Sequence, residues 1–328
     1  MPITDRINDK DLSNMEFAVP VVGGINIDIG GRPFAPLIGK DSNPGSVTIS
    51  FGGVGRNIAH NMSLLGIRTC LLTALGDDIF TQRIDDSCRA ASIDISRAVK
   101  IQGGVSSVYL YINDSSGDMS LAIADMEICD RITPEYLAGH LQFLNKAPLV
   151  MVDTNIPELS ISWLTEHCSR PIFADCVSTK KAEKLRCSLG KIHTLKANRL
   201  EAELLSGIPI KDEDSLQAAA RSLLGTGLQR VFISLGPDGV LAYDGREMLR
   251  ETCCPAQVKN AGGAGDAFMA ALALCFLKGL SLAETCRCAS AAASIATESE
   301  ETINPAMSAE AVQKRAELMP AARNISIS

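Results

Sequence analysis

A seven-residue run, Asn260-Ala-Gly-Gly-Ala-Gly-Asp266, places small residues and one acid directly before an apolar helical stretch, Ala267–Leu277. Glycines let backbone N–H groups approach a ligand because no side chain intervenes. The N-terminus of a helix adds unpaired donors and a partial positive charge, which together favour phosphate. A carboxylate at this position suits proton transfer from an attacking hydroxyl better than phosphate binding. The run therefore predicts phosphoryl transfer onto an alcohol, with Asp266 as the base and with amides at Gly263, Ala264 and Gly265 facing the phosphate. A tight turn before a helix is the alternative.

A second glycine-rich turn, Gly52-Gly-Val-Gly-Arg-Asn57, precedes a predicted helix that ends near Gly66. Gly52 and Gly53 would let a small polar substrate lie against the backbone, and the Asn57 amide could bond a hydroxyl. A plain helix-initiating turn explains the same residues.

The first predicted strand, which we expect to begin at Val19 and to be buried, carries polar residues at its end. Asn26 and Asp28 alternate with isoleucines at its end, and buried polar groups need partners. Two sugar hydroxyls would supply them, since a carboxylate accepts and an amide both donates and accepts. Capping of a neighbouring loop would also satisfy them.

Two further segments are compatible with a nucleotide and its metal ion. Asn198 and Glu201 stand three residues apart on one helical face, where they could hold Mg²⁺ through water; a capping box is the alternative. Ser234-Leu-Gly-Pro-Asp-Gly239 follows a predicted strand, and its hydroxyl and amides, including those at Gly236 and Gly239, could meet a nucleotide. An ordinary hairpin explains that turn equally well.

Strand and helix patterns alternate along most of the chain, which indicates a mostly parallel sheet covered by helices on both faces. The expected strands are 19–29, 47–51, 69–75, 149–152, 171–174 and 230–234, and the expected helices are 159–168, 179–189, 198–205, 216–224, 264–278, 281–297 and 308–317. Ligands bind at the carboxyl ends of such strands, and the candidates there are Asn26, Asp28, Asn155, Asp175 and Ser234.

One region departs from this alternation. Val105–Ile112 and Ser120–Ala124 flank a turn and predict a β-hairpin. We expect a single domain over 18–320, a small β-sheet lid from about 32–51 and 103–126, and an N-terminal tail, 1–17.

Composition narrows the class of protein. The chain has 328 residues with 31 Lys and Arg against 38 Asp and Glu, a net charge of −7, and no basic block, which argues against nucleic acid as a partner. The eleven cysteines include no Cys-x-x-Cys pair, so we expect reduced thiols rather than a metal site or disulfides. The longest apolar run, Ala267–Leu277, is too short to span a bilayer. The sequence therefore predicts a cytoplasmic protein that acts on small molecules.

Motifs of other enzyme classes are missing. The sequence has no Gly-x-x-x-x-Gly-Lys-Ser/Thr loop, no Gly-x-Gly-x-x-Gly after a strand and no Gly-x-Ser-x-Gly. From Val19 to Asn304 the ordered motifs instead resemble the ribokinase (PfkB) family of carbohydrate and nucleoside kinases. Gly52–Asn57 is similar to its N-terminal signature, Asn198–Glu201 to its Asn-x-x-Glu motif, and Gly263–Asp266 to its C-terminal signature.

The resemblance implies a ribokinase-like α/β/α sandwich with a β-sheet lid, a nucleoside or sugar substrate, ATP, Mg²⁺ and often a homodimer that pairs through the lid. It implies general-base catalysis by Asp266. It implies substrate contacts at Asn26, Asp28, Gly52, Gly53, Asn57, Asp125 and Asn155, and nucleotide contacts at Asn198, Ser234, Gly236, Gly239, Asn260, Gly263 and Gly265. It implies a magnesium site at Asn198 and Glu201.

Two departures from the family pattern bear on the ligands. Asn260 and Gly262 stand where many relatives carry Asp and Thr in a segment that helps hold a monovalent cation, so potassium dependence stays open. Val54 stands where lysine is common in the substrate turn, which suggests a substrate other than ribose. A kinase for ribose or another nucleoside, and a catalytically silent sugar or nucleoside binder acting as a regulator, remain alternatives.

Overall fold

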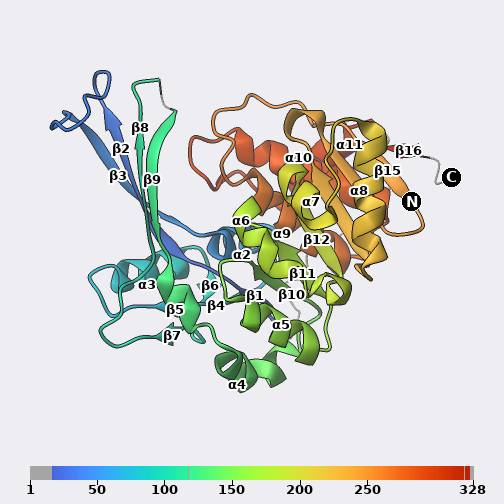
Figure 1. Ribbon diagram of the computed structural model, residues 1–328, viewed down its shortest axis with the longest axis horizontal. Coiled ribbons are helices and arrows are strands. Elements are labelled where there is room, and N and C mark those ends of the chain that lie inside the picture. The colour runs from blue at the N-terminus through green and yellow to red at the C-terminus, as the bar shows by residue number, and fades with distance from the viewer. Residues whose placement is uncertain (1–16, 117, 321, 326–328) are drawn as a thin grey trace.

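The computed structural model describes residues 17–116, 118–320 and 322–325 (Figure 1). Within them, a central sheet has the strand order β16-β15-β14-β13-β12-β11-β10-β1-β4-β6. The bounds of its strands are β1 Val19–Val22, β4 Thr69–Leu72, β6 Ile93–Asp94, β10 Val150–Asp153, β11 Ile172–Asp175, β12 Thr194–Asn198, β13 Arg230–Ser234, β14 Val240–Tyr243, β15 Met248–Glu251 and β16 Arg323–Ile325.

All neighbours from β6 to β13 pair in parallel, whereas β13 to β16 pair antiparallel. Parallel strands require crossover connections, and here helices supply many of them and cover both faces of the sheet. The helices are α2 Val54–Leu64, α3 Thr81–Ala90, α4 Pro134–Leu144, α5 Glu158–His167, α6 Thr179–Ala182, α7 Arg199–Ser206, α8 Glu213–Gly225, α9 Ala264–Leu277, α10 Leu282–Thr297 and α11 Ala309–Glu317.

The core is divided by the sheet into two apolar clusters. One joins the sheet to α2, α3, α9, α10 and α11, and the other joins it to α4, α5, α7 and α8. Helix α9 is buried from Asp266 to Cys275, as expected of a helix that is apolar all round. The result is the predicted three-layer α/β/α sandwich, with a rigid helix behind the Gly263–Asp266 turn.

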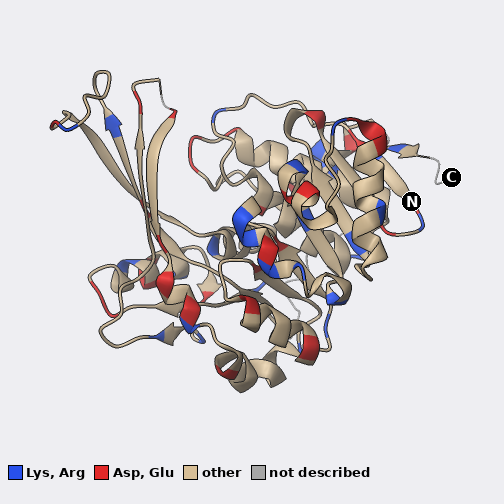
Figure 2. Ribbon diagram, viewed as in Figure 1, with Lys and Arg blue, Asp and Glu red and all other residues tan. Residues whose placement is uncertain are grey.

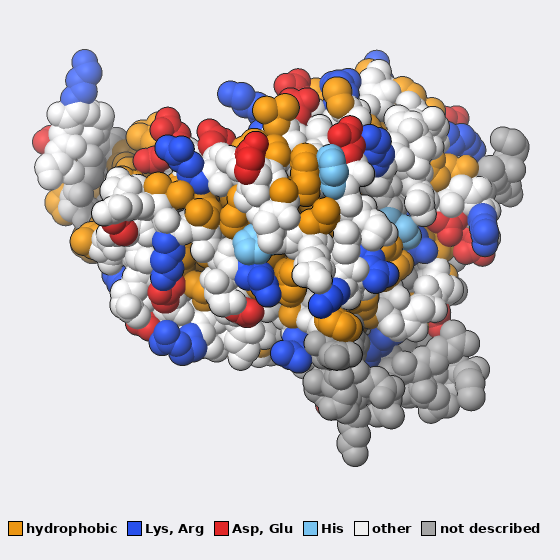
Figure 3. Space-filling view, turned by 90° about the horizontal axis from the view of Figure 1, so that it is seen from below, with side chains coloured by type: hydrophobic (Ala, Val, Ile, Leu, Met, Phe, Trp, Pro, Cys, Tyr) orange, Lys and Arg blue, Asp and Glu red, His pale blue; other side chains and the backbone are white. Residues whose placement is uncertain are grey.

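A smaller four-stranded sheet forms the lid and projects from the body (Figures 1 and 3). Its order is β3-β2-β8-β9, with β2 Asn26–Pro33, β3 Gly45–Gly52, β8 Val108–Asn113 and β9 Met119–Asp125. The predicted hairpin of β8 and β9 is confirmed. A two-stranded sheet of β5 Ala74–Leu75 and β7 Val99–Lys100 lies apart from both larger sheets.

Several predicted elements are wrong. The buried strand expected from Val19 through Ile29 ends at Val22, and after Gly23-Gly24 the chain enters the lid as β2. Asn26 and Asp28 therefore begin a lid strand rather than end a central one. The strand expected over 69–75 is divided between two sheets, because β4 ends at Leu72. The helix expected over 179–189 contains only the single turn of α6 and short 3₁₀ segments.

The surface carries Lys and Arg interspersed with Asp and Glu along the ribbons (Figure 2). All eleven cysteines are free thiols in the structure, and most are buried. In the part of the chain that the structure describes, no helix is long and apolar enough to cross a membrane. The predicted N-terminal tail lies outside the described residues except for Phe17.

Candidate active site

The N-terminus of α9 presents free backbone donors. Gly263 has φ of 78°, and a Cβ there would overlap the carbonyl of Thr302, so glycine is needed to turn the chain into the helix. The amides of Ala264, Gly265 and Asp266 donate no hydrogen bond to any residue that the structure describes. A helix start with open amides and a positive dipole end favours a phosphate group.

Asp266 lies in the first turn of α9 and is buried. Its Oδ2 accepts a hydrogen bond of 3.0 Å from Asn57 Nδ2 of α2, so the two glycine turns meet at this pair. Burial first, and then the nearby Asp175 carboxylate, raise the pKa of Asp266 to about 7, although Lys196 and Asn57 act in the opposite direction. A carboxylate with this pKa is suited to accept and release a proton near neutral pH.

Lys196 lies between these groups and has no role in the sequence-based predictions. It projects from β12, and its Nζ forms an ion pair of 3.1 Å with Asp175 Oδ2 at the end of β11. A Cβ placed on Gly265 would lie 2.6 Å from this Nζ, so the lysine faces the start of α9 directly. Burial disfavours the charged ammonium, but Asp175, Glu201 and Asp266 together raise the pKa of Lys196 above its ordinary value. The site therefore holds a charged lysine whose side chain is only 13% exposed.

A cavity of about 470 Å³ opens in front of the α9 N-terminus. Ala264, Gly265 and Lys196 line it, and the predicted nucleotide residues Ser234, Gly236 and Gly239 line it as well. Val240, Phe268, Pro255 and Ala293 make much of the remaining wall apolar. A mainly apolar cavity whose lining includes a lysine and open helix amides has the character expected of a site for a nucleotide base and its phosphates.

Asn198 and Glu201 form a capping box at the start of α7. Asn198 Oδ1 accepts the Glu201 amide at 3.0 Å, and Glu201 Oε2 accepts the Asn198 amide at 2.7 Å. The structural alternative is therefore present, and a metal role remains a prediction. Glu201 is buried, and burial raises the pKa of its carboxyl while the Asn198 amide and Lys196 counteract this rise. No cluster of three or more His, Cys, Asp or Glu side chains suited to a metal ion occurs among the residues described.

The predicted sugar-binding residues gather at the base of the lid. Asn26 Nδ2 donates to Asp28 Oδ1 at 2.6 Å, and a Cβ on Gly52 would overlap the Asp28 carboxylate. Burial raises the pKa of Asp28, opposed by its bond with Asn26 and by the charge of Arg56. Gly53, with φ of 98°, packs against the backbone of Gly24. The structure thus brings Asn26, Asp28 and Gly52 together, which sequence proximity alone did not establish.

Asp153 and Asn155 are polar residues at the carboxyl end of β10, and both contact the turn that leads from β1 into the lid. The buried Asp153 accepts the Gly24 amide at 2.9 Å and the Asn155 amide at 2.8 Å, which fixes the turn between β1 and the lid. The side chain of Asn155 lies against Gly24 and accepts a 2.5 Å bond from Lys181 Nζ. Sequence reasoning did not single out Asp153 or Lys181.

Two predicted residues lie apart from these groups. Asp125 ends β9 opposite Val108 and is exposed on the lid. Asn260 accepts the Gly262 amide at 2.8 Å and donates to the Glu300 carbonyl at 3.0 Å, so its side chain holds the loop before α9. Substrate contact at Asp125 and nucleotide contact at Asn260 stay predictions.

The sequence and the fold are similar to those of known kinases. The sequence model of the pfkB family of carbohydrate kinases matches residues 17–309. The chain belongs to this family. The chain is 39% identical over 295 residues to the pseudouridine kinase of Escherichia coli, covering 88% of this chain and 93% of that protein. It is also 36% identical to an uncharacterized sugar kinase of the same bacterium, over 93% of this chain and 85% of that protein.

A solved structure shares the fold of this pfkB family chain. The ribokinase of Arabidopsis thaliana, complexed with ribose and ATP, has a TM-score of 0.82 at 22% identity, covering 93% of this chain and 100% of that one. The predicted family and the ribokinase-like fold are thereby confirmed. The chain is therefore a kinase of this family.

Proposed function

We propose that this kinase transfers the γ-phosphate of ATP to the 5′-hydroxyl of pseudouridine and so forms pseudouridine 5′-phosphate in pseudouridine catabolism. The main support for phosphoryl transfer is the position of Asp266, a buried carboxylate with a pKa of about 7 in the first turn of α9. The choice of substrate is supported by the 39% identity to a pseudouridine kinase.

The proposed phosphoryl transfer needs only ATP and the nucleoside as reactants. Asp266 takes the proton of the 5′-hydroxyl as that oxygen bonds to the γ-phosphorus, and the bond from this phosphorus to the bridging oxygen of ADP breaks. The free amides at the start of α9 and the Lys196 ammonium stabilise charge on the transferred group. Asn26, Asp28 and Asn57 hold the ribose hydroxyls. The apolar cavity lined by Ser234, Gly236 and Gly239 receives the nucleotide.

The residues present fit a magnesium ion carried in with ATP rather than a cage built by protein. Glu201 Oε2 is engaged in the capping box, but the second carboxylate oxygen is left to hold a metal-bound water together with Asn198. Mg²⁺ bound there would neutralise phosphate charge. For potassium, the Asn260 side chain is occupied by the Gly262 amide and the Glu300 carbonyl, so activation by this ion stays an open question.

A substrate panel tests the proposal. ADP release with MgATP and pseudouridine, uridine, ribose, inosine or adenosine is measured, and the phosphorylated product is detected by mass. We expect selective turnover of pseudouridine. Turnover of another acceptor would keep the mechanism and replace the substrate. Nucleoside binding with no turnover on any acceptor would favour the regulator and overturn the proposed kinase reaction.

The lid supports the further proposal of a homodimer. Its register places Ile29, Ile49, Leu110 and Ile123 in one row across the four strands, and Val47, Ile112 and Leu121 in the next. Paired residues share a face, and Val47 and Ile123 are 70% and 59% exposed. Asp28 and Tyr109 belong to the opposite face, so a second copy can cover the apolar face without blocking the substrate. Light scattering of the wild type and of Ile49→Lys/Ile123→Lys tests this, with a monomer expected only for the variant.

A further inference from the structure

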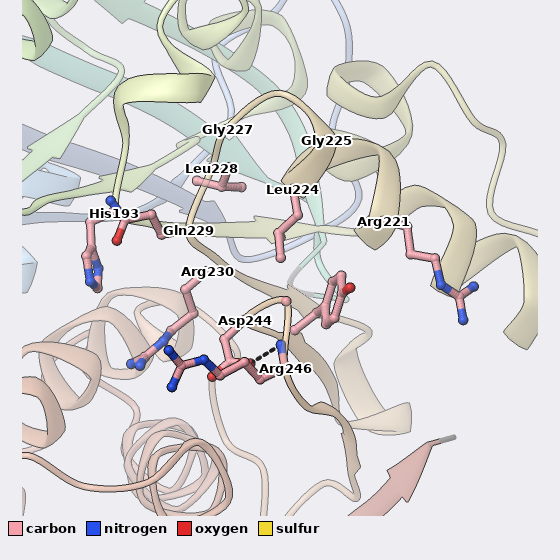
Figure 4. A pocket seen from close by; sticks show the side chains of 12 residues that line it. His193, Arg221, Leu224, Gly225, Gly227, Leu228, Gln229, Arg230, Asp244 and Arg246 are labelled. Atoms are coloured by element: carbon pink, nitrogen blue, oxygen red, sulfur yellow. Dashed lines mark hydrogen bonds between the residues drawn. The ribbon is translucent and has the colours of Figure 1, made fainter. Parts of the chain in front are cut away.

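A second cavity, of about 690 Å³, lies at the other end of the strands that carry the kinase site (Figure 4). It is lined by His193, which precedes β12, by Arg230, which begins β13, and by the β14–β15 turn with Asp244 and Arg246. Lys196, Asn198 and Ser234 stand further along the same two strands, at their carboxyl ends. One cavity therefore lies at the amino ends of β12 and β13, and the other lies at their carboxyl ends.

The lining of this second cavity is strongly basic for a chain with a net charge of −7. Arg221, Arg230 and Arg246 contribute three positive charges, and Asp244 is the only carboxylate among the lining residues. His193 adds no charge near neutral pH, because burial and the adjacent Arg230 lower its pKa to about 4. The local charge thus favours anions although the chain as a whole does not.

None of the three arginines forms an ion pair within the described part of the chain. Figure 4 shows the side chains of Arg230 and Arg246 directed toward each other on one side of the cavity, while Arg221 points away. Asp244 is engaged locally, since its Oδ1 accepts the amides of Arg246 and Glu247, each at 2.9 Å. Two like charges that point toward one another favour a shared anion.

The surrounding groups define what kind of anion fits. The amides of Gly227 and Gln229 already donate to the carbonyls of Leu224 and Ile192, so these amides do not supply an oxyanion cradle. The arginine side chains must therefore provide the recognition, and guanidinium groups bind phosphate oxygens in bidentate geometry. Leu224, Leu228 and Tyr243 add an apolar wall, and the volume lies in the range of small-molecule sites.

We propose that this cavity is a second ligand site, which binds a phosphate monoester of nucleotide size through Arg230 and Arg246. The site is separate from the kinase centre and does not depend on which acceptor the kinase phosphorylates. The phosphate bridges the two guanidinium groups, and the remainder of the ligand lies along Leu224, Leu228 and Tyr243.

Calorimetric titration with uridine 5′-monophosphate tests the proposal, with uridine as the probe that lacks the phosphate. The proteins are the wild type, Arg230→Gln/Arg246→Gln, and Arg83→Gln/Arg89→Gln, a charge-matched control on two exposed arginines of α3. We expect saturable binding below about 1 mM in the wild type and in the control. The double variant should lose this component by about tenfold or more, and uridine should not reproduce it.

Any binding of the probe in the kinase cavity would persist in all three proteins, so the comparison isolates the arginine cavity. Equal isotherms for the wild type and the double variant would overturn the proposal, as would the absence of saturable binding in the wild type. Melting curves establish that the variants fold. If the double variant does not, Arg246→Gln alone replaces it, because Arg246 is an exposed turn residue, and it should weaken binding by about tenfold.

Discussion

Helices α2 and α9 both begin after a glycine with positive φ, Gly53 at 98° and Gly263 at 78°, and they pack against each other. At the start of α2, atoms of Gly24 and Asp153 occupy the space next to the first turn of the helix. The Arg56 amide donates to the Gly24 carbonyl at 3.2 Å, and a Cβ on Gly55 would lie 3.0 Å from Asp153 Oδ2. At the start of α9 the amides are free and face a cavity with Lys196.

The difference separates two uses of one local motif. A glycine before a helix relieves backbone strain in both places. The Arg56 amide of α2 is already bonded, whereas the first three amides of α9 donate to no described residue and have a cation beside them. The α2 turn instead places Asn57 against Asp266. We infer that the start of α2 helps to bind the acceptor substrate, whereas the start of α9 binds the transferred phosphate. Matched substitutions in the two turns should therefore have different effects.

The largest effect is expected for Asp266→Asn, which keeps the shape of the side chain and removes the base. Turnover should fall by about 10²–10⁴-fold, the range for loss of a general base. ATP binding, measured by calorimetry, should change little. Near-normal turnover would remove Asp266 from the proposed mechanism.

Lys196→Met should lower turnover by about 10²–10³-fold, because a charge-stabilising donor near the phosphate is lost. The substitution also leaves Asp175 buried without its partner, which is destabilising. The double variant Lys196→Met/Asp175→Asn separates the two effects: its melting temperature should recover toward that of the wild type while its turnover stays low. Recovery of turnover together with stability would show that the lysine acts only through folding.

An alanine in the α9 turn should mainly lower turnover, whereas an alanine in the α2 turn should mainly lower stability. In Gly265→Ala the added Cβ displaces only the flexible end of Lys196, so turnover should fall about tenfold with little loss of stability. In Gly53→Ala a positive φ and close backbone atoms of Gly24 and Ile25 should cost about 1–3 kcal/mol of unfolding free energy. Urea unfolding and steady-state kinetics on both variants check this. An unstable Gly265→Ala, or a stable Gly53→Ala, would break the comparison.

The pH dependence follows from the same carboxylate. Because Asp266 must be ionised to act as a base, kcat/KM should fall about tenfold per pH unit below its pKa of about 7. A profile that stays flat from pH 8 to pH 5 would contradict the assignment of this group.

A smaller effect concerns stability. The folded pKa of Asp266 is raised above the ordinary 3.8, so its stabilising contribution is full below 3.8 and is lost as the pH rises to about 7. At pH 8, Asp266→Asn should therefore melt at the same temperature as the wild type or a few degrees above it, about the shift that 1 kcal/mol produces. A clearly lower melting temperature would mean that the ionised carboxylate stabilises the fold.

Local patterns predicted the two helix starts, the β8–β9 hairpin and the parallel sheet, because glycine turns and apolar periodicity depend on neighbouring residues. The break after Val22 was not predictable in this way. Gly24 is held by Asp153, which lies 129 residues away in the sequence, and only the folded chain brings them together. Asn26 and Asp28 were therefore assigned to the wrong sheet.

Lys196 was missed for a related reason. A lysine between Leu195 and Ala197 in the strand Thr194–Asn198 was a visible anomaly, since a buried lysine needs a partner. Its partner Asp175 lies on the adjacent strand, and the register Asp175↔Lys196 follows only from the sheet. Charged residues in apolar strands near a recognised motif are the signal that would have identified the pair.

The central claim is that phosphoryl transfer occurs at α9 and not at α2. The most direct measurement is the crystal structure of the complex with pseudouridine, Mg²⁺ and a non-hydrolysable ATP analogue. The account predicts the terminal phosphate on the amides of Ala264 and Gly265 beside Lys196, with the 5′-oxygen within hydrogen-bonding distance of Asp266. A terminal phosphate at the start of α2, or a 5′-oxygen remote from Asp266, would contradict it.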